Sequence, residues 1–249
     1  MSRKPDAILF DLYNTIVRRV TFEPETGIRS LLKLAKQPSS ISIDDALVRN
    51  ATLVTQLNPV WETSAIWSME QQFHRLLFDG LGISFDATPD ELERCFFEAA
   101  VAIEPTEGIQ QCLSKLRARG IRLGVVSNDV FTGTLLHSAL GRLEIADPFE
   151  FVVSSADYGI GKPHPIIFET AVAKLGVERA TTWFVGDNLK ADIAGANEVG
   201  LFSVWYNPDD KKRGYIEPGV TIRSWAEFEV LIETSSGGSP ILKVKKKFV

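Results

Sequence analysis

Five short apolar runs constrain what this chain can fold into. Their residues are almost continuously apolar and rich in valine, leucine, isoleucine and aromatic types, which is typical of strands buried on both faces of a parallel sheet. Amphipathic helical patterns lie among the last four runs and just before them, so strands and helices alternate. The five runs are residues 7–10, 123–126, 151–153, 183–185 and 202–205.

The helical patterns predict how this sheet is covered. In residues 108–119, the side chains of Ile109, Cys112, Leu113 and Leu116 fall on one helical face. Residues 165–175 and 191–199 behave in the same way. We therefore expect an α/β fold in which helices cover a parallel sheet on both sides.

The gap between the first two runs is too long for a simple crossover between parallel strands, since about a hundred residues separate them. Helices are expected in this gap at residues 31–35, 44–57, 65–78 and 89–101. We interpret the gap as a helical cap inserted into the core, because the first strand precedes it and its partner strands follow. The expected division is 1–18 plus 104–234 for the α/β core, 19–103 for the cap and 235–249 for a flexible basic tail.

Composition narrows the partners and the compartment. The net charge of −5 disfavours a dedicated nucleic-acid surface. The sequence contains no stretch of about 18 apolar residues, so no membrane helix is expected. Cys95 and Cys112 lack metal-ligand or redox-motif spacing, so we expect them to be reduced and the protein to be cytoplasmic. The expected partner is a small-molecule substrate, and the expected state is a monomer or homodimer.

Polar residues follow the predicted strands where each strand ends. In open parallel sheets, ligands bind beyond the carboxyl ends of the strands. An acid follows the first run, a hydroxyl and an amide follow the second, a lysine lies in the loop after the third, and two acids follow the fourth. These residues are Asp11, Ser127, Asn128, Lys162, Asp187 and Asp192.

Each of these residue types suits one step of phosphoryl transfer. A carboxylate such as Asp11 can attack the substrate and form a covalent ester. Carboxylates gathered at one edge repel each other unless a cation lies between them, and Mg²⁺ prefers such oxygen ligands. The ammonium of Lys162 can stabilise the transferring group and keep Asp11 ionised, while Ser127 can donate a hydrogen bond to a phosphoryl oxygen.

The ordered set resembles the motifs of the haloacid dehalogenase-like hydrolase superfamily, in the branch with a helical cap between its first two motifs. The resemblance covers roughly residues 5–210. It implies a three-layer Rossmann-like core, a cap that opens and closes over the site, and an aspartate nucleophile. The matching positions, in motif order, are Asp11, Thr15, Ser127, Asn128, Lys162, Asp187 and Asp192.

The resemblance also implies a role for each position. Catalysis would involve Asp11, Ser127, Lys162 and Tyr13. Substrate contacts would come from Thr15 and Asn128. The ligands of Mg²⁺ would be Asp11, Asp187, Asp192 and the backbone carbonyl of Tyr13.

The chain departs from the family pattern at Tyr13. Phosphatases of the family usually carry a second aspartate there, which protonates the leaving group and later activates water. A tyrosine of ordinary pKa near 10 is a poor general base at neutral pH. Asn14 replaces the usual glycine, and asparagine also adopts turn conformations.

Tyr13 instead resembles the 2-haloacid dehalogenases, whose halide leaves without a proton. In that alternative, Arg49 of the cap is a halide or carboxylate partner. The fourth motif argues against it, because those dehalogenases have a metal-free segment where this chain keeps Asp187 and Asp192. Phe168 also stands where dehalogenases usually have tyrosine.

We therefore favour a Mg²⁺-dependent phosphatase that acts on a small phosphorylated metabolite. A missing general acid would suit substrates with good leaving groups, such as acyl phosphates. Two alternatives stay open: a metal-free 2-haloacid dehalogenase, and a catalytically weak scaffold that binds a phosphorylated metabolite or a protein.

Overall fold

The computed structural model describes residues 4–36, 41–61 and 66–235. Within this part of the chain, six parallel strands form one sheet in the order β5-β4-β1-β6-β7-β8. The predicted parallel α/β sheet is confirmed, and its sixth strand was not predicted because it spans only three residues. The strands are β1 (Ala7–Phe10), β4 (Arg122–Ser127), β5 (Phe149–Ser154), β6 (Thr182–Gly186), β7 (Phe202–Tyr206) and β8 (Val220–Ile222).

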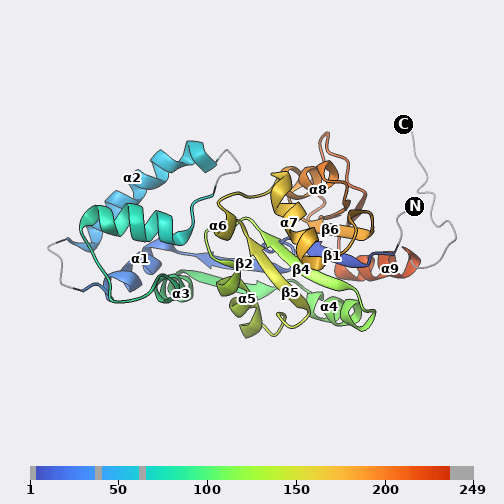
Figure 1. Cartoon of the computed structure of the whole chain (residues 1–249), viewed down its shortest axis with the longest axis horizontal. Coiled ribbons are helices and arrows are strands. Elements are labelled where there is room, and N and C mark those ends of the chain that lie inside the picture. Colours follow the sequence, from blue (N-terminus) through green and yellow to red (C-terminus); the bar gives the residue numbers. More distant parts are fainter. Residues whose placement is uncertain (1–3, 37–40, 62–65, 236–249) are drawn as a thin grey trace.

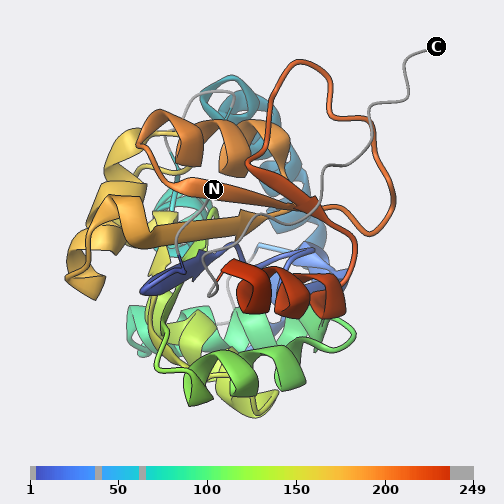
Figure 2. The same cartoon turned by 90° about the vertical axis from the view of Figure 1, so that its right-hand side faces the viewer.

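Alternate side chains of β1 point into different layers. Ile8 and Phe10 pack into one apolar cluster with α4, α5 and α9, whereas Ala7 and Leu9 pack into a second cluster with α7 and α8. Figure 2 shows these helices on the two sides of the sheet. Their bounds are α4 (Ile109–Ala118), α5 (Gly133–Arg142), α9 (Trp225–Ser235), α7 (Pro165–Leu175) and α8 (Gly195–Glu198).

The described elements between residues 24 and 100 are helical and lie at the opposite end of the molecule from the sheet (Figure 1). The expected helix at 31–35 is wrong in its bounds, because the helix begins at Pro24 and ends at Leu32. Proline suits a first helical turn, and Gly27 lets the helix approach Phe96, whose ring would lie 2.5 Å from a Cβ there. The elements are α1 (Pro24–Leu32), α2 (Ile43–Trp61), the π-helical η1 (Glu70–Phe78), η2 (Asp79–Leu81) and α3 (Pro89–Ala100).

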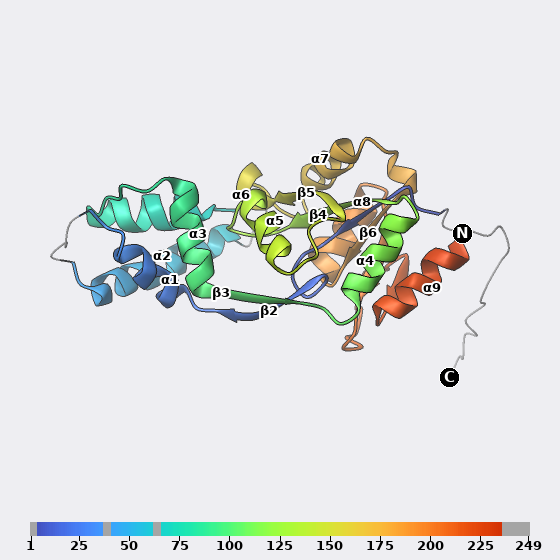
Figure 3. The same cartoon turned by 90° about the horizontal axis from the view of Figure 1, so that it is seen from below.

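An antiparallel ribbon that the sequence did not predict joins the helical part to the sheet. It consists of β2 (Val17–Phe22) and β3 (Val101–Pro105), which run side by side in Figure 3. The expected cap boundaries, after residues 18 and 103, fall inside these two strands, and the division into domains stays a prediction. Most of β2 is exposed, so its sequence lacks the apolar run that marks a buried strand.

Thr106, directly after β3, anchors the ribbon to the core. Its hydroxyl donates to the carbonyl of Thr15 at 2.8 Å and accepts a hydrogen bond from Trp225 Nε1 at 2.9 Å. The two ends of the ribbon therefore start from fixed points beside β1.

The structure bears on the expectations for membrane helices, cysteines and the C-terminal tail. No helix in the described ranges is long and apolar enough to cross a membrane. Cys95 and Cys112 are both free thiols. The expected basic tail lies outside the described residues from position 236 onward.

We expect Phe228→Ala to lower the free energy of unfolding by about 3–5 kcal/mol, because it removes a fully buried ring. The ring of Phe228 contacts those of Phe10, Trp183 and Trp225 at centroid distances of 6.2, 6.3 and 5.8 Å. Val230→Ala is the matched control on the same helix: its side chain is 57% exposed, so the change should stay within about 0.5 kcal/mol. Urea unfolding of both variants measures the difference, and equal effects would contradict this packing.

Candidate active site

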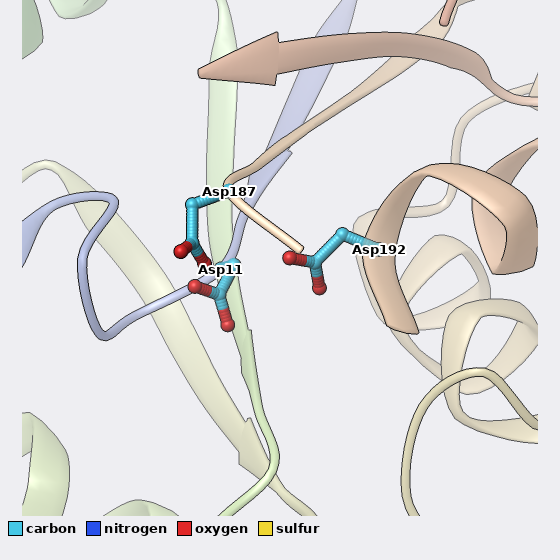
Figure 4. A group of neighbouring side chains, drawn as sticks. All are labelled: Asp11, Asp187 and Asp192. Atoms are coloured by element: carbon cyan, nitrogen blue, oxygen red, sulfur yellow. The ribbon is translucent and has the colours of Figure 1, made fainter. Parts of the chain in front are cut away.

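Three carboxylates from separate elements meet at the carboxyl edge of the sheet. Asp11 follows β1, Asp187 follows β6, and Asp192 lies in the π-helical segment η4 (Leu189–Ala194). One oxygen from each lies within 4.8 Å of the others, and Figure 4 shows the three side chains converging. The structure thus brings together the acids that the sequence placed at one edge.

Lys162 lies buried among these acids, with only 4% of its surface exposed. Its Nζ is 2.5 Å from Asp11 Oδ1, 2.8 Å from Asp192 Oδ1 and 2.8 Å from the carbonyl of Val126. Burial alone lowers the pKa of a lysine, but the two carboxylates outweigh it and raise the pKa of Lys162 above its ordinary value. One positive charge therefore faces three acidic groups.

The local sequence around Asp187 places Asp192. Gly186 has no side chain, and a Cβ there would lie 2.5 Å from Asp192 Cγ, so the carboxylate packs directly on the end of β6. Asp192 Oδ2 accepts a hydrogen bond from the backbone N–H of Asn188 at 2.9 Å. The Asn188 side chain in turn caps η4 by accepting from the N–H groups of Lys190 and Ala191. The Gly-Asp-Asn sequence thus fixes the position of the Asp192 carboxylate, which contacts Lys162.

Asn128 holds the loop that carries Lys162. Its Nδ2 donates to the Lys162 carbonyl at 2.7 Å, and its Oδ1 accepts from the Lys162 N–H at 2.7 Å. Gly161 permits this approach, because a Cβ there would lie 2.6 Å from Asn128 Oδ1. The structure gives Asn128 a positioning contact, and the substrate contact expected for it stays a prediction.

Two hydroxyls lie at the same edge of the sheet and differ in their hydrogen bonding. Thr15 donates to Asp11 Oδ2 at 2.9 Å and is fully buried, so it fixes the carboxylate rather than facing an open site. Ser127 Oγ is buried and has no hydrogen-bond partner among the described residues. An orphaned buried hydroxyl at a site edge is available to a ligand, and the catalytic role expected of Ser127 stays a prediction.

The side chain of Tyr13 lies beside Arg19 of β2 and near Asp129. The guanidinium of Arg19 lies 3.9 Å from the centre of its ring. Burial first, and then the nearby Asp129, raise the pKa of Tyr13 well above its ordinary value, so its phenol stays protonated at neutral pH. Asn14 takes the left-handed conformation at φ 58° that the tight turn needs. The Tyr13 carbonyl as a metal ligand stays a prediction.

The sequence-based prediction did not assign a role to Asp129, which is only 7% exposed. Its Oδ1 accepts from the backbone N–H groups of Val130 and Phe131 at 2.7 and 3.3 Å, while its Oδ2 has no hydrogen-bond partner in the described part of the chain. Burial raises the pKa of Asp129 to about 6, against the opposing effects of Tyr13 and Arg19. The sequence did hold one signal for Asp129: it is the third consecutive polar residue after the strand, following Ser127 and Asn128.

Arg49 is placed differently from the other expected residues. It lies on α2, and its guanidinium is 3.9 Å from where a Cβ of Gly80 would stand. The cavity that borders Asn128 is lined by Asn50 and Val54 from the same helix rather than by Arg49. The structure therefore gives no support to the contact expected of Arg49.

The geometry equips this edge for nucleophilic chemistry on an anion. Asp11 is held by Lys162 and Thr15, and it keeps 8% of its surface exposed. Counting Lys162 against the three carboxylates leaves two negative charges without a cationic partner when all are ionised. Oxygen ligands with this excess charge match a divalent cation.

The chain is similar to several known proteins. The pyrimidine 5′-nucleotidase YjjG of Escherichia coli is 28% identical over 236 residues, which is 92% of this chain and 98% of that protein. The glyceraldehyde 3-phosphate phosphatase of Pyrococcus abyssi is 38% identical over 99 residues, 40% of this chain and 41% of that protein. The crystal structure of a 2-haloacid dehalogenase from Pseudomonas syringae pv. tomato superposes with a TM-score of 0.64 over 94% of this chain and 99% of that one. It is 24% identical and shows the fold alone.

The family assignment rests on a longer match. The family model described as haloacid dehalogenase-like hydrolase matches residues 5–200. This span includes all three carboxylates, Lys162 and Ser127. The chain therefore belongs to the haloacid dehalogenase-like hydrolase family.

Proposed function

We propose that this hydrolase is a Mg²⁺-dependent phosphatase that acts on a small phosphorylated metabolite through an aspartyl-phosphate at Asp11. One observation carries the proposal: three buried or half-buried carboxylates gather at one edge, and among the described residues Lys162 is the cation that forms ion pairs with them. Without a further cation, one lysine would offset only part of the mutual repulsion of the three carboxylates. The names of the nucleotidase and phosphatase relatives point to phosphate esters as well.

Asp11, Asp187 and Asp192 would hold the ion, together with the carbonyl of Tyr13. Their oxygens suit Mg²⁺, which would neutralise charge on the transferring phosphoryl group. Burial, followed by the charge of Asp11, raises the pKa of Asp187 to about 6, and the charges of Lys211 and Lys162 offset this only in part.

The side chains of the site would carry out the chemical steps. A carboxylate oxygen of Asp11 attacks phosphorus, the bond from phosphorus to the leaving oxygen breaks, and an acyl phosphate forms. Lys162 and Ser127 stabilise the phosphoryl oxygens by charge and by a donated hydrogen bond. Water then attacks phosphorus, which releases phosphate and restores Asp11.

The site lacks an evident acid to protonate the leaving group at the position of Tyr13. The phenol of Tyr13 has a pKa raised above its ordinary value and points towards Asp129 and Arg19. A missing general acid typically costs about 10²–10⁴-fold in rate. Substrates whose leaving oxygen needs little proton donation are therefore favoured.

Tyr13 also favours the second candidate, a 2-haloacid dehalogenase. Two features count against that activity. The acids that a metal-free reaction does not need, the half-buried Asp187 and the buried Asp192, lie close together, and Phe168 packs against Phe184 at 4.9 Å as part of the core. Chloride release from 2-chloropropionate in the presence of EDTA would favour the dehalogenase, and tight phosphoester binding without turnover would favour a scaffold.

We expect phosphate release from a phosphoester panel that requires Mg²⁺, stops with EDTA, and falls at least about 10³-fold in Asp11→Asn. Asp6→Asn is the matched control, because it makes the same change at an exposed acid just before β1. It should retain activity. Phosphate release by Asp11→Asn at the unmodified rate would refute the nucleophile.

Tyr13→Asp should raise the turnover of an alkyl phosphate by about 10²-fold, because a carboxylic acid would then stand where the family's proton donor is found. An aryl phosphate, whose leaving group needs no proton, should gain far less. Tyr13→Asn, similar in size but unable to donate an acidic proton, controls for the loss of the ring. If Tyr13→Asp turned over the alkyl phosphate more slowly, or no better than Tyr13→Asn, a missing acid could not be the limitation.

The affinity for Mg²⁺ should fall as the pH drops through about 6. Because Asp187 is protonated below its raised pKa, the ion must displace a proton there, and above that pKa it need not. Between pH 7.5 and 5.5 the dissociation constant should rise at least about fourfold for one such carboxyl, and the raised pKa of Asp192 adds to the effect. Calorimetric titration measures it, and a pH-independent affinity is the contrary result.

A further inference from the structure

Asp187 is held differently from the other two carboxylates of the site. Asp11 and Asp192 each form an ion pair with Lys162, whereas no ion pair within the described part of the chain ties down Asp187. Asp187 is half-buried and directly follows Gly186, the last residue of β6. The place of its carboxylate therefore depends strongly on the backbone at the end of this strand.

The indole of Trp205 holds the backbone of Asp187. Its Nε1 donates a hydrogen bond to the Asp187 carbonyl at 2.8 Å. Trp205 belongs to the neighbouring strand β7, where it is paired with Gly186 in the parallel ladder. The side chain thus reaches past the end of the ladder and ties the first residue after β6 to the next strand.

Burial fixes the direction of this donor. Only 3% of the surface of Trp205 is exposed. Val204 and Tyr206, its neighbours on β7, pack into the apolar cluster beside α4, α5 and α9. Because successive side chains of a strand point to opposite faces, Trp205 points to the face that α7 and α8 cover. A large ring enclosed in this way presents its single N–H in one direction.

A buried indole needs an acceptor, but this need alone does not decide which acceptor it uses. Trp225 meets the need with the hydroxyl of Thr106 at 2.9 Å. Trp205 instead uses the backbone of an acid that has a carboxylate oxygen within 4.8 Å of oxygens of Asp11 and Asp192. Its hydrogen bond therefore joins the packing of β7 to the geometry of the acid cluster.

We propose that Trp205 is a positioning residue for the divalent cation. It acts through Asp187: the indole N–H holds the backbone at this residue, so one oxygen ligand is in place before the ion binds and less order is lost on binding. The inference rests on the proposed function in one respect, namely that a divalent cation binds between these acids. It does not depend on the transfer of a phosphoryl group.

Trp205→Phe removes the donor and keeps an aromatic ring. Calorimetric titration of the full chain with Mg²⁺ should give a dissociation constant raised at least about tenfold, which is the usual effect of losing a group that orients a metal ligand. Trp183→Phe is the matched control, because it makes the same change at a buried residue of the adjacent strand β6, packed against Phe202 at 4.8 Å. It should weaken the fold in urea and leave the affinity for Mg²⁺ unchanged.

Replacement of Trp205 by 3-benzothienylalanine separates the donor from the shape of the ring. This amino acid keeps the bicyclic ring and has sulfur in place of the N–H group, so it preserves the packing of the side chain. The affinity for Mg²⁺ should fall as in Trp205→Phe, since both variants lack the donor. An affinity equal to that of the unmodified chain would mean that packing alone matters, and it would overturn the proposal.

The unmodified chain offers a reading that does not depend on how a variant folds. In ¹⁵N-labelled protein, the indole N–H resonance of Trp205 should shift as Mg²⁺ is added, because its acceptor belongs to a residue that binds the ion. The indole resonance of Trp183 should stay in place. A Trp205 resonance that does not move at saturating Mg²⁺ would contradict the coupling.

The outcomes separate this inference from the proposed function. If the unmodified chain binds Mg²⁺ and both Trp205 variants bind it equally well, the positioning role fails and the phosphatase proposal stands. If the variants weaken Mg²⁺ binding but the unmodified chain releases no phosphate from any phosphoester, the phosphatase proposal fails and the positioning role stands. A chain that does not bind Mg²⁺ at all overturns both.

Discussion

The site depends on the buried ion pair of Lys162 with Asp11 and Asp192. Three acids from two strand ends and one π-helical turn are brought close together, and only a cation makes that arrangement tolerable. Lys162 supplies one positive charge and also orients the carboxylate of Asp11. In the proposed function, the remaining negative charge would give the edge its affinity for a divalent ion and, through that ion, for a phosphoryl group.

Much of the surrounding structure serves to hold these four side chains. Gly186 gives Asp192 room to pack against β6, and Asn128 ties down the backbone of Lys162. Thr15 holds the second oxygen of Asp11. The same loop that carries Ser127 and Asn128 continues into Asp129 and Phe131, which face the helical part. One loop therefore joins the candidate active site to the cavity beside the helical part.

The strands and helices that could be predicted from the sequence are those with a continuous or periodic apolar pattern that is buried in the fold. Residues 7–10 and 165–175 were placed at their observed bounds because burial on both sides of the sheet or on one helix face leaves a strong pattern. The ribbon of β2 and β3 left no such pattern, since β2 is mostly exposed and β3 is mostly half-buried. The positions of Asp129 and Arg49 depend on how α2 and the loop after β4 pack together, and such contacts between distant segments carry no local signal.

The central claim is that the carboxylates at the sheet edge enclose a divalent cation, and it is tested most directly by the anomalous difference density of crystals grown with Mn²⁺. The account predicts one strong peak, coordinated octahedrally at about 2.2 Å by carboxylate oxygens of Asp11 and Asp187. The same crystals should lose the peak in Asp187→Asn. An absence of density between these carboxylates at saturating Mn²⁺, with the side chains in the positions described, would contradict it.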